Sequence, residues 1–223
     1  MPNYEYVSRN EYQPVREELE FIIRKAQKIL KKETGITFQF ELIGSGSKHL
    51  ITRIVGGNKG FDFDYNIILN DPAEENKIWN ADFARKEFTK ALKEAVRGTQ
   101  YGCPENSSVA ITIKVKDTKK SKIRHSCDFA IVYYPGDEDD GYKFAKLNLE
   151  TSKCTWEIRK HTKQYRAKLG WLKDSIEGYW NDIRDEYLDL KNSNNDPNKH
   201  SFQLFYEAIN NVFNHYYKQY KNS

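Results

Sequence analysis

The sequence predicts an α+β fold, in which a sheet-forming N-terminal part is followed by a C-terminal layer of helices. Two observations predict it. Up to about residue 134, periodic patterns follow one another in the order helix, strand, strand, helix, strand, strand. From about Thr155 onward, apolar residues recur at helical spacing. The change of pattern predicts a sheet-forming core, preceded by a helix, over residues 1–150 and a helical subdomain over residues 151–223.

Composition narrows the class of protein. The 223 residues are 38% hydrophobic and 30% charged, and fifteen Tyr and twelve Phe supply apolar area for a core. No segment approaches the roughly 18 apolar residues of a membrane span, and the first residues lack the apolar region of a secretory signal. The three cysteines, Cys103, Cys127 and Cys154, have no metal-ligand spacing. We therefore expect a reduced, cytoplasmic protein without a membrane segment. The net charge of +4 permits a polyanionic substrate without requiring one.

The first elements are a helix and two strands. A helical repeat of apolar residues begins at Pro14, and Gly35 follows its lysine-rich last turn. Residues 37–43 alternate in hydrophobicity as a strand does, and end in the polar turn Gly-Ser-Gly-Ser at 44–47. After a glycine-rich loop, residues 61–69 alternate again and predict a second strand.

The remaining pattern predicts one more helix, two strands and the C-terminal helices. Residues 80–96 are amphipathic at helical spacing, and residues 108–115 and 125–134 alternate as strands. Beyond Thr155, Gly170 and Gly178 are candidate helix breaks. The last helix carries an apolar stripe that consists of Phe202, Phe205, Ile209, Val212, Phe213 and Tyr216.

The second strand carries the most informative residues. Asp62 and Asp64 are two positions apart, so their side chains project from the same face of the strand. Two adjacent carboxylates repel each other, and an unpaired buried carboxylate is costly. A divalent cation removes this conflict, and Mg²⁺ prefers carboxylate and phosphate oxygens. The pair therefore predicts a magnesium site, with Mn²⁺ as the alternative ion.

A third acid, Asp128, interrupts the apolar strand at residues 125–134. If this strand lies beside that of Asp62 and Asp64, three carboxylates converge and can hold two metal ions about 3.5–4 Å apart. One ion then activates an acceptor hydroxyl, and the other orients a triphosphate and stabilises the leaving pyrophosphate. Asp128 is the additional ligand of the activating ion and a candidate base for the hydroxyl.

The turn before these strands is a candidate phosphate-binding element. Gly46 and Ser47 end a strand and offer backbone N–H groups and a hydroxyl, which can hold phosphate oxygens. Thr52 offers a further hydroxyl. A Gly-Ser pair alone is a weak indication of phosphate binding, because such pairs are common in loops. The indication is stronger when the pair is followed by an Asp-x-Asp strand and then by a strand with a single Asp, as it is here.

That order of motifs resembles the DNA polymerase β-like nucleotidyltransferase superfamily. The resemblance rests on residues 42–47, on Asp62-Phe63-Asp64 and on Asp128, and it covers roughly residues 13 to 135. Residues 46–52 are also similar to the Gly-Ser-x-x-x-x-Thr variant of bacterial cGAS-like enzymes. The resemblance implies a mixed sheet with helices on one side, and transfer of a nucleoside monophosphate from a nucleoside triphosphate such as ATP to a hydroxyl.

The resemblance also implies a cation for the triphosphate after the third acid, for which Lys160 and Lys163 are the candidates. It leaves open whether Gly44-Ser45 or Gly46-Ser47 contacts phosphate, and the second pair keeps Thr52 in register. The acceptor, whether a nucleotide, an RNA end, a small molecule or a protein, is not fixed by the residues. Two alternative functions are a non-catalytic nucleotide-binding or antitoxin-type module of the same fold, and a two-metal phosphodiesterase or nuclease.

Overall fold

The computed structural model describes residues 3–72, 74, 77–134, 141–160 and 164–221. They divide into two compact units that are each built from separated stretches of chain. The sheet unit comprises Val7–Ile51 and Gly57–His161. The helical unit comprises Met1–Tyr6, Thr52–Gly56 and Thr162–Ser223. The predicted domain boundary at residue 150 stays a prediction.

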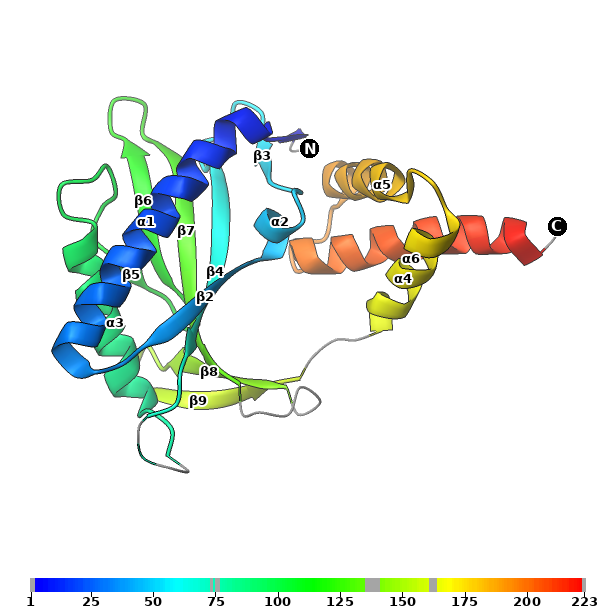
Figure 1. The fold of residues 1–223 in the computed structure, drawn as a ribbon. Helices are drawn as coiled ribbons and strands as arrows, with labels where there is room; N and C mark the ends of the chain where they lie inside the picture. Colours follow the sequence, from blue (N-terminus) through cyan, green and yellow to red (C-terminus); the bar gives the residue numbers. More distant parts are fainter. Residues whose placement is uncertain (1–2, 73, 75–76, 135–140, 161–163, 222–223) are drawn as a thin grey trace. The chain divides into compact units, whose positions relative to one another are not determined.

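The sheet unit has a mixed seven-stranded sheet in the order β2-β4-β7-β6-β5, with β8 paired to β7 and β9 paired to β8. Strands β4 and β7 are parallel, and the other described pairs are antiparallel. This confirms the predicted α+β fold (Figure 1). The elements are α1 (Arg9–Thr34), β2 (Phe38–Ile43), α2 (Gly44–Ser47), β4 (Phe61–Leu69), α3 (Ala81–Ala95), β5 (Glu105–Asn106), β6 (Ile111–Asp117), β7 (Lys122–Tyr133), β8 (Tyr142–Leu147) and β9 (Cys154–Arg159).

Helices α1 and α3 pack against each other and cover one face of this sheet (Figure 1). The alternation of β4 places Phe61, Phe63 and Tyr65 in the core beneath them. Burial of these side chains, together with the apolar stripe of α1, contributes to the hydrophobic stabilisation of the unit. The opposite face of β4 therefore carries its polar residues, Asp62 and Asp64.

Helix α1 ends as the sequence predicts and begins earlier. Gly35 adopts φ 76° and donates its N–H to the carbonyl of Lys31, which closes the last turn. The helix begins at Arg9 and not at Pro14, which lies inside it. A proline inside the helix removes one backbone hydrogen bond, and the remaining bonds of this 26-residue helix are retained around it.

Two segments differ from the prediction. The helical pattern expected from Thr155 onward begins at Gln164, because Cys154–Arg159 forms β9 against β8. Its aromatic and β-branched residues favour this hairpin, and the indole of Trp156 donates a hydrogen bond of 2.7 Å to the carbonyl of Trp79. The Gly-Ser-Gly-Ser segment, predicted as a polar turn, is the single helical turn α2.

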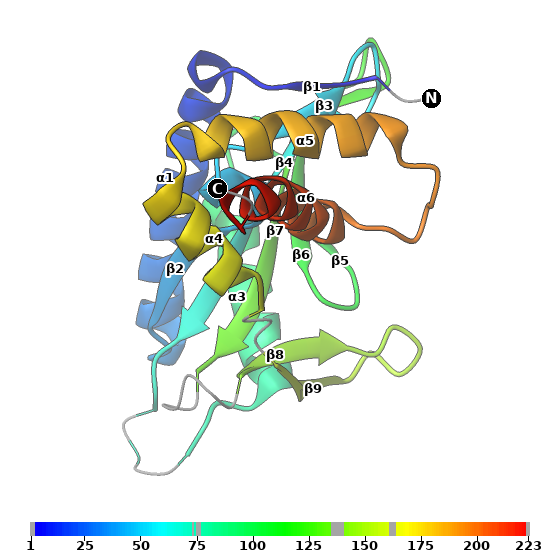
Figure 2. The ribbon, with the colours of Figure 1, turned by 90° about the vertical axis from the view of Figure 1, so that its right-hand side faces the viewer.

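The helical unit contains α4 (Gln164–Ser175), α5 (Tyr179–Ser193) and α6 (Ser201–Lys221), together with the short strands β1 (Tyr4–Tyr6) and β3 (Thr52–Ile54). Helix α5 packs along α6, and α4 contacts both (Figure 2). Gly178, with φ 77°, separates α4 from α5 as predicted, whereas Gly170 lies within α4.

The two short strands of the helical unit pair antiparallel and are attached to α5. The N–H of Tyr4 donates to Oδ1 of Asn192 at 2.6 Å, and the hydroxyl of Tyr6 donates to the carbonyl of Arg184 at 2.6 Å. The N-terminal residues are therefore part of the helical unit. Among the described residues, no helix combines the length and the apolar character that crossing a membrane requires.

Candidate functional site

The structure brings the three predicted carboxylates together on the face of the sheet that α1 and α3 do not cover. Asp64 on β4 lies directly opposite Asp128 on β7 in the parallel pair, and Asp62 lies one pleat away, opposite Ser126. Burial, followed by the negative charges of Asp62 and Asp128, raises the pKa of Asp64 to about 7. Three acidic groups thus share one electrostatic environment, while their catalytic role stays a prediction.

A glycine before β4 allows this register. Gly60 has φ 62°, and a Cβ built on it would lie 2.1 Å from the carbonyl oxygen of Arg124. The main chain of β4 therefore approaches β7 more closely at this point than a residue with a side chain allows. From there the parallel pairing runs from Phe61 opposite His125 to Asp64 opposite Asp128.

The two Gly-Ser pairs have different neighbours. Gly44 has φ 64°, and a Cβ there would lie 2.7 Å from Oδ2 of Asp64. A Cβ on Gly46 would instead lie 2.9 Å from Cδ1 of Leu42, in the packed interior. Ser47 is exposed, and its hydroxyl donates to the carbonyl of Gly44 at 3.0 Å. Gly44-Ser45 is thus the pair beside the carboxylates, and Ser47 reaches the same turn through its hydroxyl.

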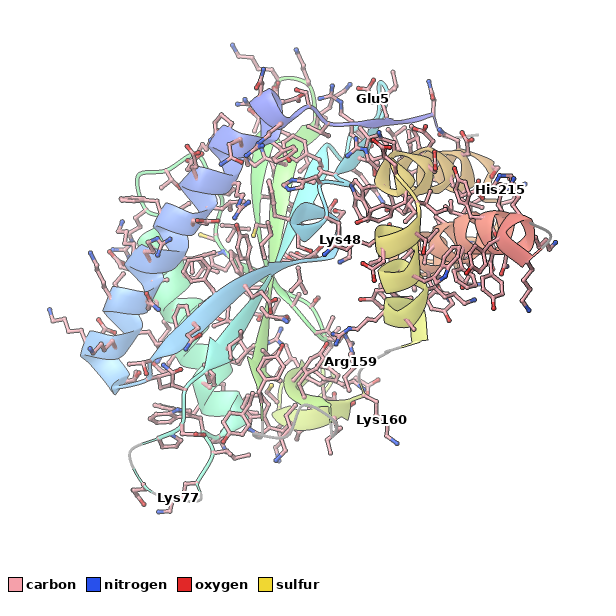
Figure 3. The ribbon with its side chains drawn as sticks, turned by 45° about the vertical axis from the view of Figure 1, so that its right-hand side comes forward. Glu5, Lys48, Lys77, Arg159, Lys160 and His215 are labelled. Atoms are coloured by element: carbon pink, nitrogen blue, oxygen red, sulfur yellow. The ribbon has the colours of Figure 1, made fainter. Side chains whose placement is uncertain are left out.

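The other predicted phosphate contacts are Thr52, Lys160 and Lys163. Thr52 belongs to β3 of the helical unit, where its hydroxyl accepts a hydrogen bond of 2.8 Å from Nζ of Lys191. Lys160 is exposed at the end of β9 and lies apart from the α2 turn (Figure 3). Lys163 lies outside the described residues. A phosphate-binding role for each of the three stays a prediction.

A cation that the sequence analysis missed is Lys48, which follows the Gly-Ser pair directly (Figure 3). Its Nζ donates to the carbonyl of Gly44 at 3.3 Å and to Oγ of Ser47 at 3.4 Å. Burial lowers the pKa of Lys48, and the negative charge of Glu41 opposes that effect. The ammonium group therefore lies on the α2 turn, and a Cβ on Gly44 of the same turn would approach Asp64. Its position directly after Gly46-Ser47 in the sequence is the feature that could have identified Lys48 as a candidate phosphate-binding residue.

A hydrogen-bond donor to the cluster was also missed. Thr112 lies on β6 directly opposite Asp128, and its hydroxyl donates to Oδ1 of that aspartate at 2.5 Å. The sequence predicted a strand over residues 108–115 and assigned no role to Thr112 within it. The partner could not be predicted, because the antiparallel register of β6 and β7 was unknown.

The donor set suits a hard divalent cation in its chemistry. Carboxylate oxygens are the ligands that Mg²⁺ prefers, and a cation would offset both the burial and the repulsion that raise the pKa of Asp64. In the part of the chain that the structure describes, no group of three or more His, Cys, Asp or Glu side chains is already arranged to hold a metal ion. The carboxylate oxygens therefore lie on one face of the sheet, but among the described residues they do not form a complete metal-coordination site.

Comparison with known proteins identifies the fold. No protein-family model and no curated protein matches the sequence. Among solved structures, that of Vibrio cholerae DncV cyclic AMP-GMP synthase, a prokaryotic cGAS homolog, matches with a TM-score of 0.64 and 12% identity, over 92% of this chain and 68% of that one. The structure of DncV with the linear intermediate 5′ pppA(3′,5′)pG also matches with a TM-score of 0.64 and 12% identity. That match covers 92% of this chain and 67% of the DncV chain.

A third structure, DncV with GTP and 5MTHFGLU2, matches with a TM-score of 0.64 and 12% identity, over 92% of this chain and 69% of that one. The chain thus spans about two thirds of the length of these structures. At this level of identity the likeness shows the fold alone. The fold that the resemblance to DNA polymerase β-like nucleotidyltransferases implied is confirmed.

Proposed function

We propose that this protein is a metal-dependent nucleotidyltransferase, which transfers a nucleoside monophosphate from a nucleoside triphosphate to a hydroxyl and releases pyrophosphate. The observation that carries the proposal is the set of three aspartates on the parallel pair β4–β7. The fold shared with DncV supports it, since DncV is a cyclic AMP-GMP synthase and one of its structures contains a linear dinucleotide intermediate.

In this proposal Asp62, Asp64 and Asp128 hold Mg²⁺, or Mn²⁺ as the alternative. The bound ions supply positive charge, which favours the ionised form of the acceptor hydroxyl and neutralises the triphosphate. Oδ1 of Asp128 accepts the hydrogen bond from Thr112, and Oδ2 is the candidate acceptor for the proton of the attacking hydroxyl. The α2 turn and Lys48 bind phosphate oxygens beside Asp64.

The test is to incubate the protein with ATP, GTP, CTP or UTP and Mg²⁺, to measure pyrophosphate, and to identify the nucleotide product. Pyrophosphate together with a nucleotidylated product supports the proposal. Hydrolysis of a phosphodiester without pyrophosphate overturns it in favour of the phosphodiesterase or nuclease. Magnesium-dependent thermal stabilisation by a triphosphate, without turnover of any of the four, overturns it in favour of the non-catalytic module.

Lys48→Ala is expected to raise the KM for the nucleoside triphosphate about 10- to 100-fold, with a smaller change in kcat. A charge-assisted hydrogen bond to phosphate contributes about 1.5–3 kcal/mol, which corresponds to this range. Steady-state kinetics at saturating Mg²⁺ measures the effect, and Lys86→Ala is the matched control because Lys86 is exposed on α3.

Comparison with Lys160→Ala decides between the two candidate lysines. A larger rise in KM for Lys160→Ala than for Lys48→Ala would assign the triphosphate contact to β9, as the sequence analysis predicted. Equal kinetics of Lys48→Ala and the wild-type protein would exclude the contact that we assign to α2.

A further inference from the structure

The hydroxyl of Thr112 makes a short contact to the carboxylate cluster, at 2.5 Å from Oδ1 of Asp128. The two residues face each other across the antiparallel pair β6–β7, and both are half-buried. A threonine hydroxyl has a single proton to donate, so this bond directs the proton toward the aspartate.

The bond opposes an electrostatic force. The negative charges of Asp62 and Asp128 act on Asp64, and Asp64 and Asp128 repel each other when both are ionised. Without a restraint, repulsion favours rotation of the Asp128 carboxylate away from the cluster. A donor from the neighbouring strand holds one of its oxygens in place, and the stiff β-branched side chain of threonine limits its own rotation.

The donor is also neutral, which distinguishes it from the nearest cation on β6. Lys114 is two residues along the same strand, and its Nζ lies 2.6 Å from Oε2 of Glu105. A lysine at position 112 would neutralise Asp128 and compete with a metal ion for it. Threonine restrains the carboxylate and leaves its negative charge available for the metal.

We propose that Thr112 is a positioning residue that holds Asp128 in the orientation required for binding the divalent cation. The proposal rests on the proposed function, because it assumes that Asp128 is a metal ligand. Hydrogen-bond partners of metal ligands orient them, and their loss typically weakens metal binding about 10- to 100-fold.

The test compares Thr112→Val, which keeps the shape and strand preference of threonine, with Thr112→Ser, which keeps the hydroxyl. Binding of Mn²⁺ to the substrate-free protein is followed by the electron paramagnetic resonance signal of free Mn²⁺. We expect Thr112→Val to bind Mn²⁺ about 10- to 100-fold more weakly and Thr112→Ser to remain within a few-fold of wild type. Thr155→Val, at an exposed position of β9, is the matched control.

Circular dichroism melting without metal verifies that each variant is folded. Equal Mn²⁺ affinity of folded Thr112→Val and wild type overturns the role of Thr112 and leaves the proposed function standing. Absence of Mn²⁺ binding by the wild-type protein overturns the metal site and, with it, both proposals. Equal weakening by Thr112→Val and Thr112→Ser overturns the positioning role, because the effect would not follow the hydroxyl.

Discussion

An Asp64→Asn variant is expected to lose about 1,000-fold or more of nucleotidyl transfer while its fold becomes more stable at neutral and alkaline pH. Activity falls because the amide lacks the charge that a metal ligand needs, and transition-state stabilisation by a bound metal amounts to several kcal/mol. Pyrophosphate release at saturating triphosphate and Mg²⁺ measures the loss.

The expected gain in stability follows from the pKa of Asp64, which burial and the two neighbouring acids raise to about 7. Between the usual aspartate value of 3.8 and about 7, the folded state binds more protons than the unfolded state. The free energy of unfolding of the metal-free wild type therefore decreases as the pH rises through this window. The amide side chain of the Asp64→Asn variant does not ionise, so the variant escapes that decrease.

Above pH 7 we expect Asp64→Asn to be more stable than wild type by about 1–2 kcal/mol in the presence of a chelator. One pKa unit corresponds to roughly 1.4 kcal/mol, and partial solvent exposure reduces the effect below the full shift. Urea unfolding at pH 5 and pH 8 measures it, with Asp174→Asn on α4 as the control for an exposed aspartate. Wild-type turnover by Asp64→Asn would remove this carboxylate from the proposed site.

Arg85→Met is expected to lower the free energy of unfolding by about 3–5 kcal/mol, because each buried carbonyl left without its hydrogen-bond donor costs about 1–3 kcal/mol. The side chain of Arg85 is 3% exposed, and its guanidinium donates to the carbonyls of Ala145, Ser107 and Ala110 at 2.7 to 2.9 Å. Methionine fills a similar volume but leaves three carbonyl oxygens without this donor.

Arg97→Met is the matched control for this prediction, because Arg97 is exposed and pairs with Glu94 on the surface of the sheet unit. A surface pair of this kind contributes up to about 1 kcal/mol. Urea unfolding followed by circular dichroism compares the two variants. A loss no larger for Arg85→Met than for Arg97→Met would show that the carbonyls find other partners at little cost.

The sequence predicted those features that depend on local pattern. Alternation in residues 61–69 correctly placed Asp62 and Asp64 on one face, because the strand period fixes side-chain direction. The apolar stripes of α1 and α3 were also predictable from spacing. The fold class followed from the order of these elements and is confirmed.

Features that depend on register or on distant partners were not predictable. Arg85 lies on the buried side of α3, and a charged residue there is tolerated only because carbonyls from three separate positions accept its hydrogen bonds. The contact of Thr112 with Asp128 requires the β6–β7 register. Strand β9 was missed because its six residues were read as the start of the helical pattern that follows, and its pairing with β8 was unknown.

The attachment of β1 and β3 to α5 restricts how this protein can be divided. A polypeptide that starts at residue 164 contains all three C-terminal helices but lacks Tyr4 and Thr52, so Asn192 and Lys191 would lose their hydrogen bonds to these two residues. A polypeptide that stops at residue 160 keeps the two-stranded ribbon without the helix on which it lies. Either truncation therefore removes part of the compact helical unit, and co-expression of both pieces would supply the missing part.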